Sequence, residues 1–165
     1  RALVGSTAVL YERRLAQFGL TVDVYQHPGA SIVAQAFSDP AMNIVAGRVE
    51  ANDRYLGDAR PMPLVQHLCG LKAGNYRFGM RANHLRFART AEADIEFQVH
   101  IALAEISGSE TFVHVQHNEE TWTVQMQGIH KYRIDDQAQV YLDQARLYVF
   151  DLDGQLVASP DNDSL

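Results

Sequence analysis

The sequence has little cysteine and no long apolar run. Cys69 is the only cysteine in 165 residues, so an internal disulfide is excluded and a reducing compartment is compatible. We expect its side chain to be a small buried hydrophobe. No segment approaches the roughly 18 consecutive apolar residues that a membrane-spanning helix needs. The opening stretch, RALVGSTAVLYERR, has too short an apolar part for a signal peptide.

Motifs for phosphate binding and nucleophilic catalysis are also missing. There is no G-x-x-x-x-G-K-[ST], no G-x-G-x-x-G after a strand, and no G-x-S-x-G. His114 and His117 in HVQH would point to opposite faces of a strand, so they cannot chelate one ion together. The run DLDG at 151–154 lacks the later ligands of a calcium loop and predicts a hairpin turn. We therefore expect neither catalytic residues nor a metal site.

What is present is typical of a soluble globular domain, with 47% hydrophobic and 21% charged residues. The net charge of −6 is unevenly placed: residues 1–43 are neutral, 44–90 carry +5 and 91–165 carry −11. Either the two charged parts neutralise each other within the folded chain, or they match between subunits. A nucleic-acid partner is disfavoured, because such proteins need clustered excess positive charge.

The first 43 residues predict a hairpin followed by helices. Val9 and Tyr11 precede a charged turn, and Leu15 and Phe18 follow it, which favours a hairpin over 7–19. The stretches TVDVYQH and ASIVAQAF have helical character and are separated by a proline. SDPAMN then breaks the pattern, and we place a boundary at residues 38–43.

Short strands follow the boundary. From Ile95 to Leu103 apolar and polar residues alternate, which predicts a strand with one buried and one solvated face. SGSE supplies a turn, and TFVHVQH returns as the next strand. Matching the two apolar faces sets the register. The predicted cross-strand pairs are Leu103 with Val113, Ile101 with Val115, and His100 with Gln116 on the solvated side.

Further strands complete a mainly β fold. TWTVQMQ places Trp122, Val124 and Met126 on one face, and QAQVYLD and ARLYVFD follow. Many short strands at this spacing predict a sandwich or a small barrel, and a barrel is preferred because it removes exposed strand edges.

Four residues are candidates for a ligand or regulatory motif: Arg81, His84, Glu110 and Thr111. Arg81 and His84, in GMRANHL, could hold an anion, or Arg81 could end a strand and bind backbone carbonyls of a turn. Glu110 and Thr111 begin the returning strand, where a carboxylate usually caps backbone N–H groups. The residues alone leave both interpretations open.

Several stretches, taken in order, resemble one family. GMRANHL is similar to a G-[IV]-R-P-E-H-[LI] motif, AEISGSETFVHV to V-E-x-L-G-[SN]-E-[TS]-x-V-x-V, and RLYVFDLDGQLV to a closing F-D-x-x-[TG]-G motif. The N-terminal stretch matches a further run at Arg14, Gln17, Gly19, Asp23, Val24, Tyr25, Pro28, Val33, Ala34, Phe37, Pro40, Met42 and Asn43. The chain thus resembles the C-terminal part of an ABC-transporter ATP-binding subunit of the maltose/glycerol-phosphate importer class. Ala82 and Asn83 replace the motif's Pro-Glu, so any role of that Glu is lost.

The resemblance implies a domain organisation. Residues 1–37 would be the C-terminal remnant of a nucleotide-binding domain, 38–43 a linker, 44–160 an OB-type (TOBE-like) small β-barrel, and 161–165 a disordered tail. A short β-hairpin and one or two helices would precede the barrel.

It also implies a function for the barrel. This part would be the regulatory and dimerisation domain of an importer for sugar, polyol, glycerol or glycerol phosphate, and would itself be non-catalytic. It would need no cofactor, whereas the parent subunit would bind ATP and Mg. Partners would be a second ATP-binding subunit, permease subunits, and a regulatory protein or small ligand, with the complex at the cytoplasmic face of the bacterial plasma membrane. The alternative is a domain that binds an oxyanion or a phosphorylated metabolite.

Overall fold

The computed structural model describes residues 5–12, 14–26, 28–37 and 39–160. The helices are α1 (Thr21–Gln26) and α2 (Ser31–Phe37). The strands are β1 (Ser6–Tyr11), β2 (Arg14–Leu20), β3 (Asn43–Glu50), β4 (Asp53–Leu56), β5 (Met62–Pro63), β6 (Gly74–Met80), β7 (Ile95–Ser107), β8 (Glu110–His117), β9 (Glu120–Gln127), β10 (Gln137–Leu142), β11 (Tyr148–Phe150) and β12 (Leu156–Ala158).

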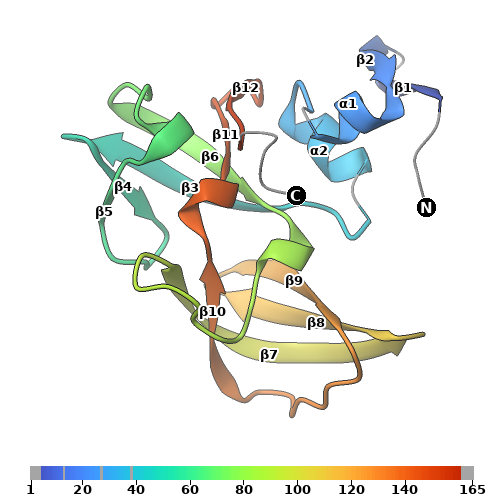
Figure 1. Cartoon of the computed structure of the whole chain (residues 1–165), viewed down its shortest axis with the longest axis vertical. Coiled ribbons are helices and arrows are strands. Elements are labelled where there is room, and N and C mark those ends of the chain that lie inside the picture. The colour runs from blue at the N-terminus through green and yellow to red at the C-terminus, as the bar shows by residue number, and fades with distance from the viewer. Residues whose placement is uncertain (1–4, 13, 27, 38, 161–165) are drawn as a thin grey trace.

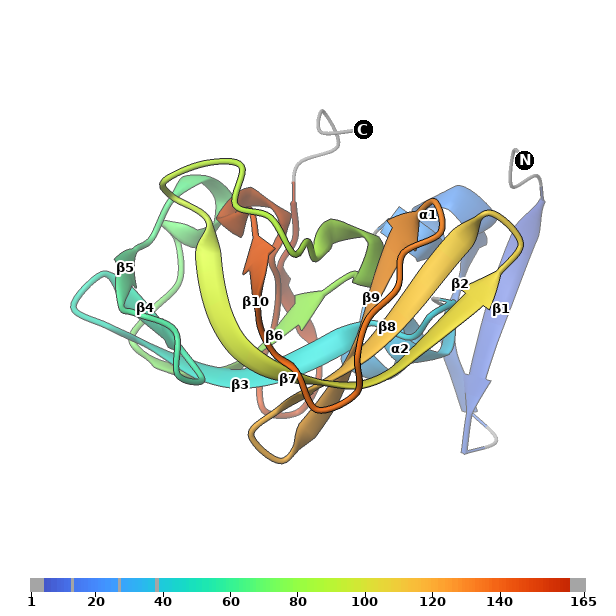
Figure 2. The same ribbon diagram turned by 90° about the horizontal axis from the view of Figure 1, so that it is seen from below.

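Two curled sheets enclose one core. The six-stranded sheet has the order β12-β11-β6-β3-β4-β5, and the four-stranded sheet has the order β10-β7-β8-β9. Figures 1 and 2 show the long, bent strand β7 curving around one side of the molecule, with the N-terminal hairpin at the far end. The expected mainly β architecture, preceded by a hairpin and one or two helices, is confirmed, and the curled sheets are consistent with the expected OB type.

Apolar side chains from both sheets fill the space between them. Phe78 of β6 and Phe97 of β7 are fully buried, as are Val115 of β8 and Trp122 of β9. The Phe97 and Trp122 rings meet edge to face with their centroids 5.0 Å apart. Such aromatic contacts add about 1 kcal/mol each beyond the burial of their area, so the sheets are joined by specific packing as well as by the hydrophobic effect.

Strand β7 contains a bulge that the sequence does not reveal. The pairs Ile101–Val115 and His100–Gln116 are as predicted, but Leu103 lies opposite His114, and Ala104 takes the place opposite Val113. The predicted Leu103–Val113 pair is therefore wrong. One extra residue between Ile101 and Leu103 shifts the register and turns Leu103 to the outer face, where it is 45% exposed.

Other local predictions have mixed outcomes. Gly154 closes the turn after β11 with φ 84°, as expected of the DLDG run. His114 and His117 do point to opposite faces of β8, the first half-buried and the second 1% exposed. Cys69, expected to be buried, is exposed, because its neighbour Leu68 fills the core at this short 3-10 turn.

The N-terminal segment packs on the barrel at β11 and β12. Ala34 and Met42 form a small second cluster with Tyr148 and Phe150, all at most 6% exposed. The N–H of Leu156 donates to the Gly29 carbonyl oxygen over 3.0 Å, so a backbone hydrogen bond also joins the two parts. The boundary at 38–43 stays a prediction, and the predicted tail at 161–165 lies outside the described residues.

Asn43 joins the beginning of β3 to the edge of β9. Its Nδ2 donates to the Thr123 carbonyl oxygen over 2.8 Å, and its Oδ1 accepts from the Thr123 N–H over 2.8 Å. The Asn43 amide thereby makes the two hydrogen bonds that a neighbouring strand would make, and the backbone N–H and carbonyl of Thr123 at the edge of the sheet both have partners. Asn43 is 6% exposed, so these bonds are shielded from water.

Asn43→Ala is expected to lower the free energy of unfolding by about 2 kcal/mol, since two buried backbone groups lose their partners. Asn43→Asp should also destabilise, because a carboxylate cannot donate to the Thr123 carbonyl. Urea denaturation measures both. The matched control is Asn75→Ala, an exposed asparagine of β6, and an equal loss in the control would contradict the role of Asn43.

Candidate functional site

The GMRANHL stretch ends β6 and forms a turn against the N-terminal segment. Gly79 faces Met42 and Phe150, and a Cβ there would lie 2.5 Å from the Met42 sulfur. The glycine is therefore needed for close packing. Arg81 keeps an extended backbone, with φ −71° and ψ 143°, and Ala82–His84 forms one 3-10 turn. Leu85 then returns to the core at 1% exposure.

Arg81 is directed into the junction with α1. Its side chain is 5% exposed, and its Nη2 donates to the backbone carbonyl oxygen of Tyr25. Its Nε donates to the Tyr148 hydroxyl over 3.2 Å. The guanidinium also lies 4.0 Å from the centre of the Tyr25 ring, a cation–π distance. These contacts join the N-terminal segment to the barrel.

His84 carries no charge at neutral pH. Burial is the largest cause that lowers the pKa of His84 from 6.5 to about 4; the positive charges of Arg146, Arg81 and Arg86 act in the same direction, and Asp143 opposes them. Its Nδ1 is buried and has no hydrogen-bond partner among the described residues. A neutral imidazole cannot add positive charge to an anion site.

Glu110 and Thr111 fasten the end of β9 and the loop after it. The Glu110 carboxylate accepts from the side-chain amides of Gln125 over 3.0 Å and of Gln127 over 2.6 Å. Thr111 is fully buried, and its hydroxyl donates to the Gly128 carbonyl oxygen over 2.8 Å and accepts from the His130 N–H over 3.0 Å. Glu110 thus binds side-chain amides, whereas the sequence suggested backbone N–H groups.

One of the four candidate residues, Arg81, lines a small cavity, and a second, Glu110, is hydrogen-bonded to another lining residue. Arg81 lines it together with Asp39 and Gln125, and Gln125 in turn holds Glu110. The cavity measures about 20 Å³, which is room for a single water. A sulfate-sized anion does not fit, and the Asp39 carboxylate would repel one. His84 and Thr111 do not line this cavity.

Two further features were sought among the described residues: a group of side chains that could hold a metal ion, and a membrane-spanning helix. No group of three or more His, Cys, Asp or Glu side chains is placed to hold a metal ion within residues 5–12, 14–26, 28–37 and 39–160. In the same part of the chain, no helix is long and apolar enough to cross a membrane.

A known family model matches part of the chain. The family model described as TOBE domain matches residues 78–150, from β6 to the end of β11. This part of the chain is similar to TOBE domains. All four candidate residues lie within the matched range.

Relatives extend the match beyond the TOBE domain. The sn-glycerol-3-phosphate import ATP-binding protein UgpC of Psychromonas ingrahamii is 26% identical over 159 residues, covering 92% of this chain and 41% of that protein. The alpha-glucoside transport ATP-binding protein AglK of Rhizobium meliloti is 25% identical over 160 residues, covering 93% and 44%. The chain is thus similar, over more than 90% of its length, to the C-terminal part of these import ATP-binding proteins, and it spans about two fifths of their length.

One solved structure is also similar, the cytoplasmic molybdate-binding protein ModG with molybdate bound. Its TM-score is 0.49 at 13% sequence identity, covering 72% of this chain and 96% of that one.

Sequence reasoning missed a buried cation beside the barrel core. Arg54 of β4 is 1% exposed and donates to the Gln144 side-chain oxygen over 2.6 Å. Burial lowers the pKa of Arg54 to about 10, so it stays charged at neutral pH. The available signal was its position two residues before Leu56, on the inward face of a strand.

His84→Gln is expected to flatten the pH dependence of stability. The unfolded chain binds a proton at His84 near pH 6.5, whereas the folded chain binds it near 4. Acid therefore favours the unfolded state. The contribution of neutral His84 to the free energy of unfolding is fully present above pH 6.5 and is lost as the pH falls toward 4. The slope is at most about 1.4 kcal/mol per pH unit. Urea denaturation at pH values from 7 to 4 measures the free energy of unfolding of the variant and of the wild type. Superimposable pH profiles of the two proteins would refute the prediction.

Arg81→Met is expected to loosen the N-terminal segment, because the carbonyl of Tyr25 and the hydroxyl of Tyr148 lose a charged donor. The substitution should lower the free energy of unfolding by about 1–3 kcal/mol. Limited proteolysis with mass spectrometry should show faster cleavage near residues 28–43. Arg77→Met, at an exposed arginine of the preceding strand β6, is the matched control. Equal cleavage of both variants would contradict the role of Arg81 in holding the N-terminal segment.

Proposed function

We propose that this chain is the C-terminal regulatory and dimerisation part of the ATP-hydrolysing subunit of an ABC importer for sugar, polyol, glycerol or glycerol phosphate. The observation that carries the proposal is the match of over 90% of the chain to import ATP-binding proteins, with the TOBE model inside that match. The names of these relatives supply the solute classes, which cover glycerol 3-phosphate and alpha-glucosides.

The N-terminal segment would belong to the nucleotide-binding domain. Its hairpin exposes apolar side chains that the barrel does not cover: Leu10 is 71%, Leu15 60% and Phe18 66% exposed. A cluster of this kind is typical of a surface that packs against more protein. The segment is joined to the barrel by Arg81 and by the cluster around Tyr148. A movement of the nucleotide-binding domain would therefore reach the barrel directly.

The remaining properties follow from the parent subunit. ATP and Mg would bind in the preceding part of that subunit, and the fragment itself would be non-catalytic. The partners would be a second ATP-binding subunit, identical or similar, and the permease subunits. Through them the protein would sit at the cytoplasmic face of the membrane. The alternative, an oxyanion site at Arg81, gains no support from a cavity of about 20 Å³.

The chain by itself is expected to leave ATP unhydrolysed in the presence of Mg²⁺ and to form a dimer at micromolar concentration. Phosphate release and static light scattering measure the two properties. Saturable hydrolysis that survives a second, unrelated purification step would overturn the non-catalytic assignment. A monomeric mass at every concentration up to about 1 mM would overturn the dimerisation role, because self-association weaker than this is too weak to count as an interface.

A further inference from the structure

Two open hollows adjoin on the outer face of the four-stranded sheet. They measure about 440 and 380 Å³, and both are lined by Asp58 and Gln98. The two hollows adjoin at these residues, and we call them together the amide groove. Six residues define it: Asp58, Arg60, Glu96, Gln98, His100 and Gln137. Its size falls within the range of small-molecule sites.

The floor of the amide groove is a polar row across three strands. Gln137 of β10 and Gln116 of β8 flank His100 of β7 on either side. One step along the sheet, Gln139 lies opposite Gln98. These side chains alternate with the buried apolar residues of β7, so the strand that fills the core also builds this surface.

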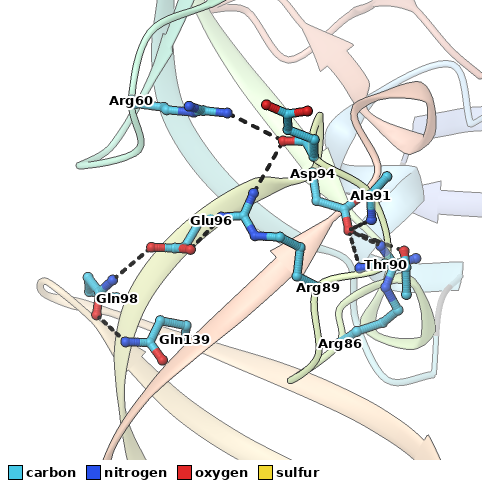
Figure 3. A network of polar contacts seen from close by, with 10 residues as sticks. Arg60, Arg86, Arg89, Thr90, Ala91, Asp94, Glu96, Gln98 and Gln139 are labelled. Carbon is cyan, nitrogen blue, oxygen red and sulfur yellow. Dashed lines mark hydrogen bonds and ion pairs between the residues drawn. The ribbon is translucent and has the colours of Figure 1, made fainter.

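Hydrogen bonds fix the orientation of the floor (Figure 3). The Gln139 amide donates to the Gln98 side-chain oxygen over 3.2 Å, and the Gln98 amide donates to Glu96 over 3.2 Å. Arg89 donates to the other oxygen of Glu96 over 2.6 Å. A side chain that is already oriented loses less entropy when it binds a ligand. Donors and acceptors are thus presented in a fixed pattern.

One buried histidine holds both residues that the hollows share. His117 is 1% exposed, and its ring is stacked on Trp122 with the centroids 4.3 Å apart. Its Nε2 lies 3.3 Å from an Asp58 carboxylate oxygen, and its Nδ1 lies 3.0 Å from the Gln98 backbone oxygen. A Cβ at Gly57 would come within 2.7 Å of Nε2, so only glycine leaves room for this contact.

The wall of the groove beside Arg89 is fixed by Asp94. This carboxylate is 3% exposed and accepts from the N–H groups of Thr90 and Ala91 and from Arg86 over 2.9 Å (Figure 3). Burial raises the pKa of Asp94, but the backbone donors and Arg86 outweigh it and keep that pKa below its usual value. Asp94 therefore stays ionised at neutral pH and continues to hold the loop that contains Thr90 and Ala91.

The charged groups of the groove balance one another. Glu96 pairs with Arg89 over 2.6 Å, and Asp58 shares the lining with Arg60, whose guanidinium donates to the Glu92 backbone oxygen over 3.3 Å. With two carboxylates and two guanidiniums, the groove has no excess charge of either sign to attract an ion. What remains is a row of neutral amides and an imidazole, each able to donate and accept hydrogen bonds.

We propose that the amide groove binds a neutral polyhydroxy compound, a polyol or a sugar. Adjacent hydroxyls each donate and accept one hydrogen bond within a short span, which matches the paired donor and acceptor of a glutamine amide. Asp58 accepts from a further hydroxyl. This site is distinct from the Arg81 turn and does not depend on the role proposed for the parent subunit.

The test is a ¹⁵N–¹H NMR titration of the full chain with glycerol, glucose and maltose. At least one of these should give saturable shifts of the Gln98 and Gln137 side-chain amides and the His100 backbone amide. Because the groove is open, Kd should be on the order of 1 mM. Parallel titrations with sulfate and glycerol 3-phosphate test whether the groove binds anions instead. Saturation by an anion alone, or only linear shifts with every neutral compound, would overturn the proposal.

Two variants make the assignment specific. Gln137→Ala and His100→Ala remove exposed groove side chains and should each weaken binding about fivefold, the loss expected for one hydrogen bond. Gln35→Ala, an exposed glutamine of α2 outside the groove, should bind as wild type does. Thermal melting confirms that each variant is folded. Equal weakening in Gln35→Ala, or unchanged binding in both groove variants, would refute the site.

Discussion

The alternation of side chains along β7 is the constraint on which the rest of the structure depends. One face carries Ile95, Phe97, Val99 and Ile101, which fill the space between the two sheets. The opposite face carries the polar row of the amide groove. The two faces cannot be changed separately, because a one-residue slip would bury the polar residues and expose the core. Core packing thus determines where the groove side chains lie.

The bulge at Ile101–Leu103 ends that arrangement. Before it, β7 follows the core, and after it the strand is largely exposed out to Ser107. A bulge increases local twist and bends a strand, which agrees with the curved path of β7 in Figure 2. The groove lies before the bulge, where β10 pairs with β7 from Ile95 to His100 and β8 joins on the other side at His100.

Sequence reasoning recovered the features that rest on local periodicity. The alternation from Ile95 gave strand β7, and the glycine at position 154 gave the closing turn, because both signals are short-range. The bulge was missed since Leu103 continues the apolar pattern although an extra residue has shifted the register. Arg54 and the groove were missed for a different reason: their partners, Gln144 and Asp58, are brought to them only by the tertiary fold. Arg81 was recognised, but its partner Tyr25 is 56 residues away.

The uneven charge of the sequence now has a structural explanation. Arg86 pairs with Asp94 over 2.9 Å and Arg89 with Glu96 over 2.6 Å, so basic residues of the 44–90 segment meet acids of the 91–165 segment within one chain. Pairing within the chain therefore accounts for part of the imbalance without a partner subunit. The more exposed of the two pairs, Arg89–Glu96, adds little stability, yet it also bears on the ligand class. Neutralised guanidiniums attract no anion, and a surface rich in arginine becomes one that favours neutral hydroxyl compounds.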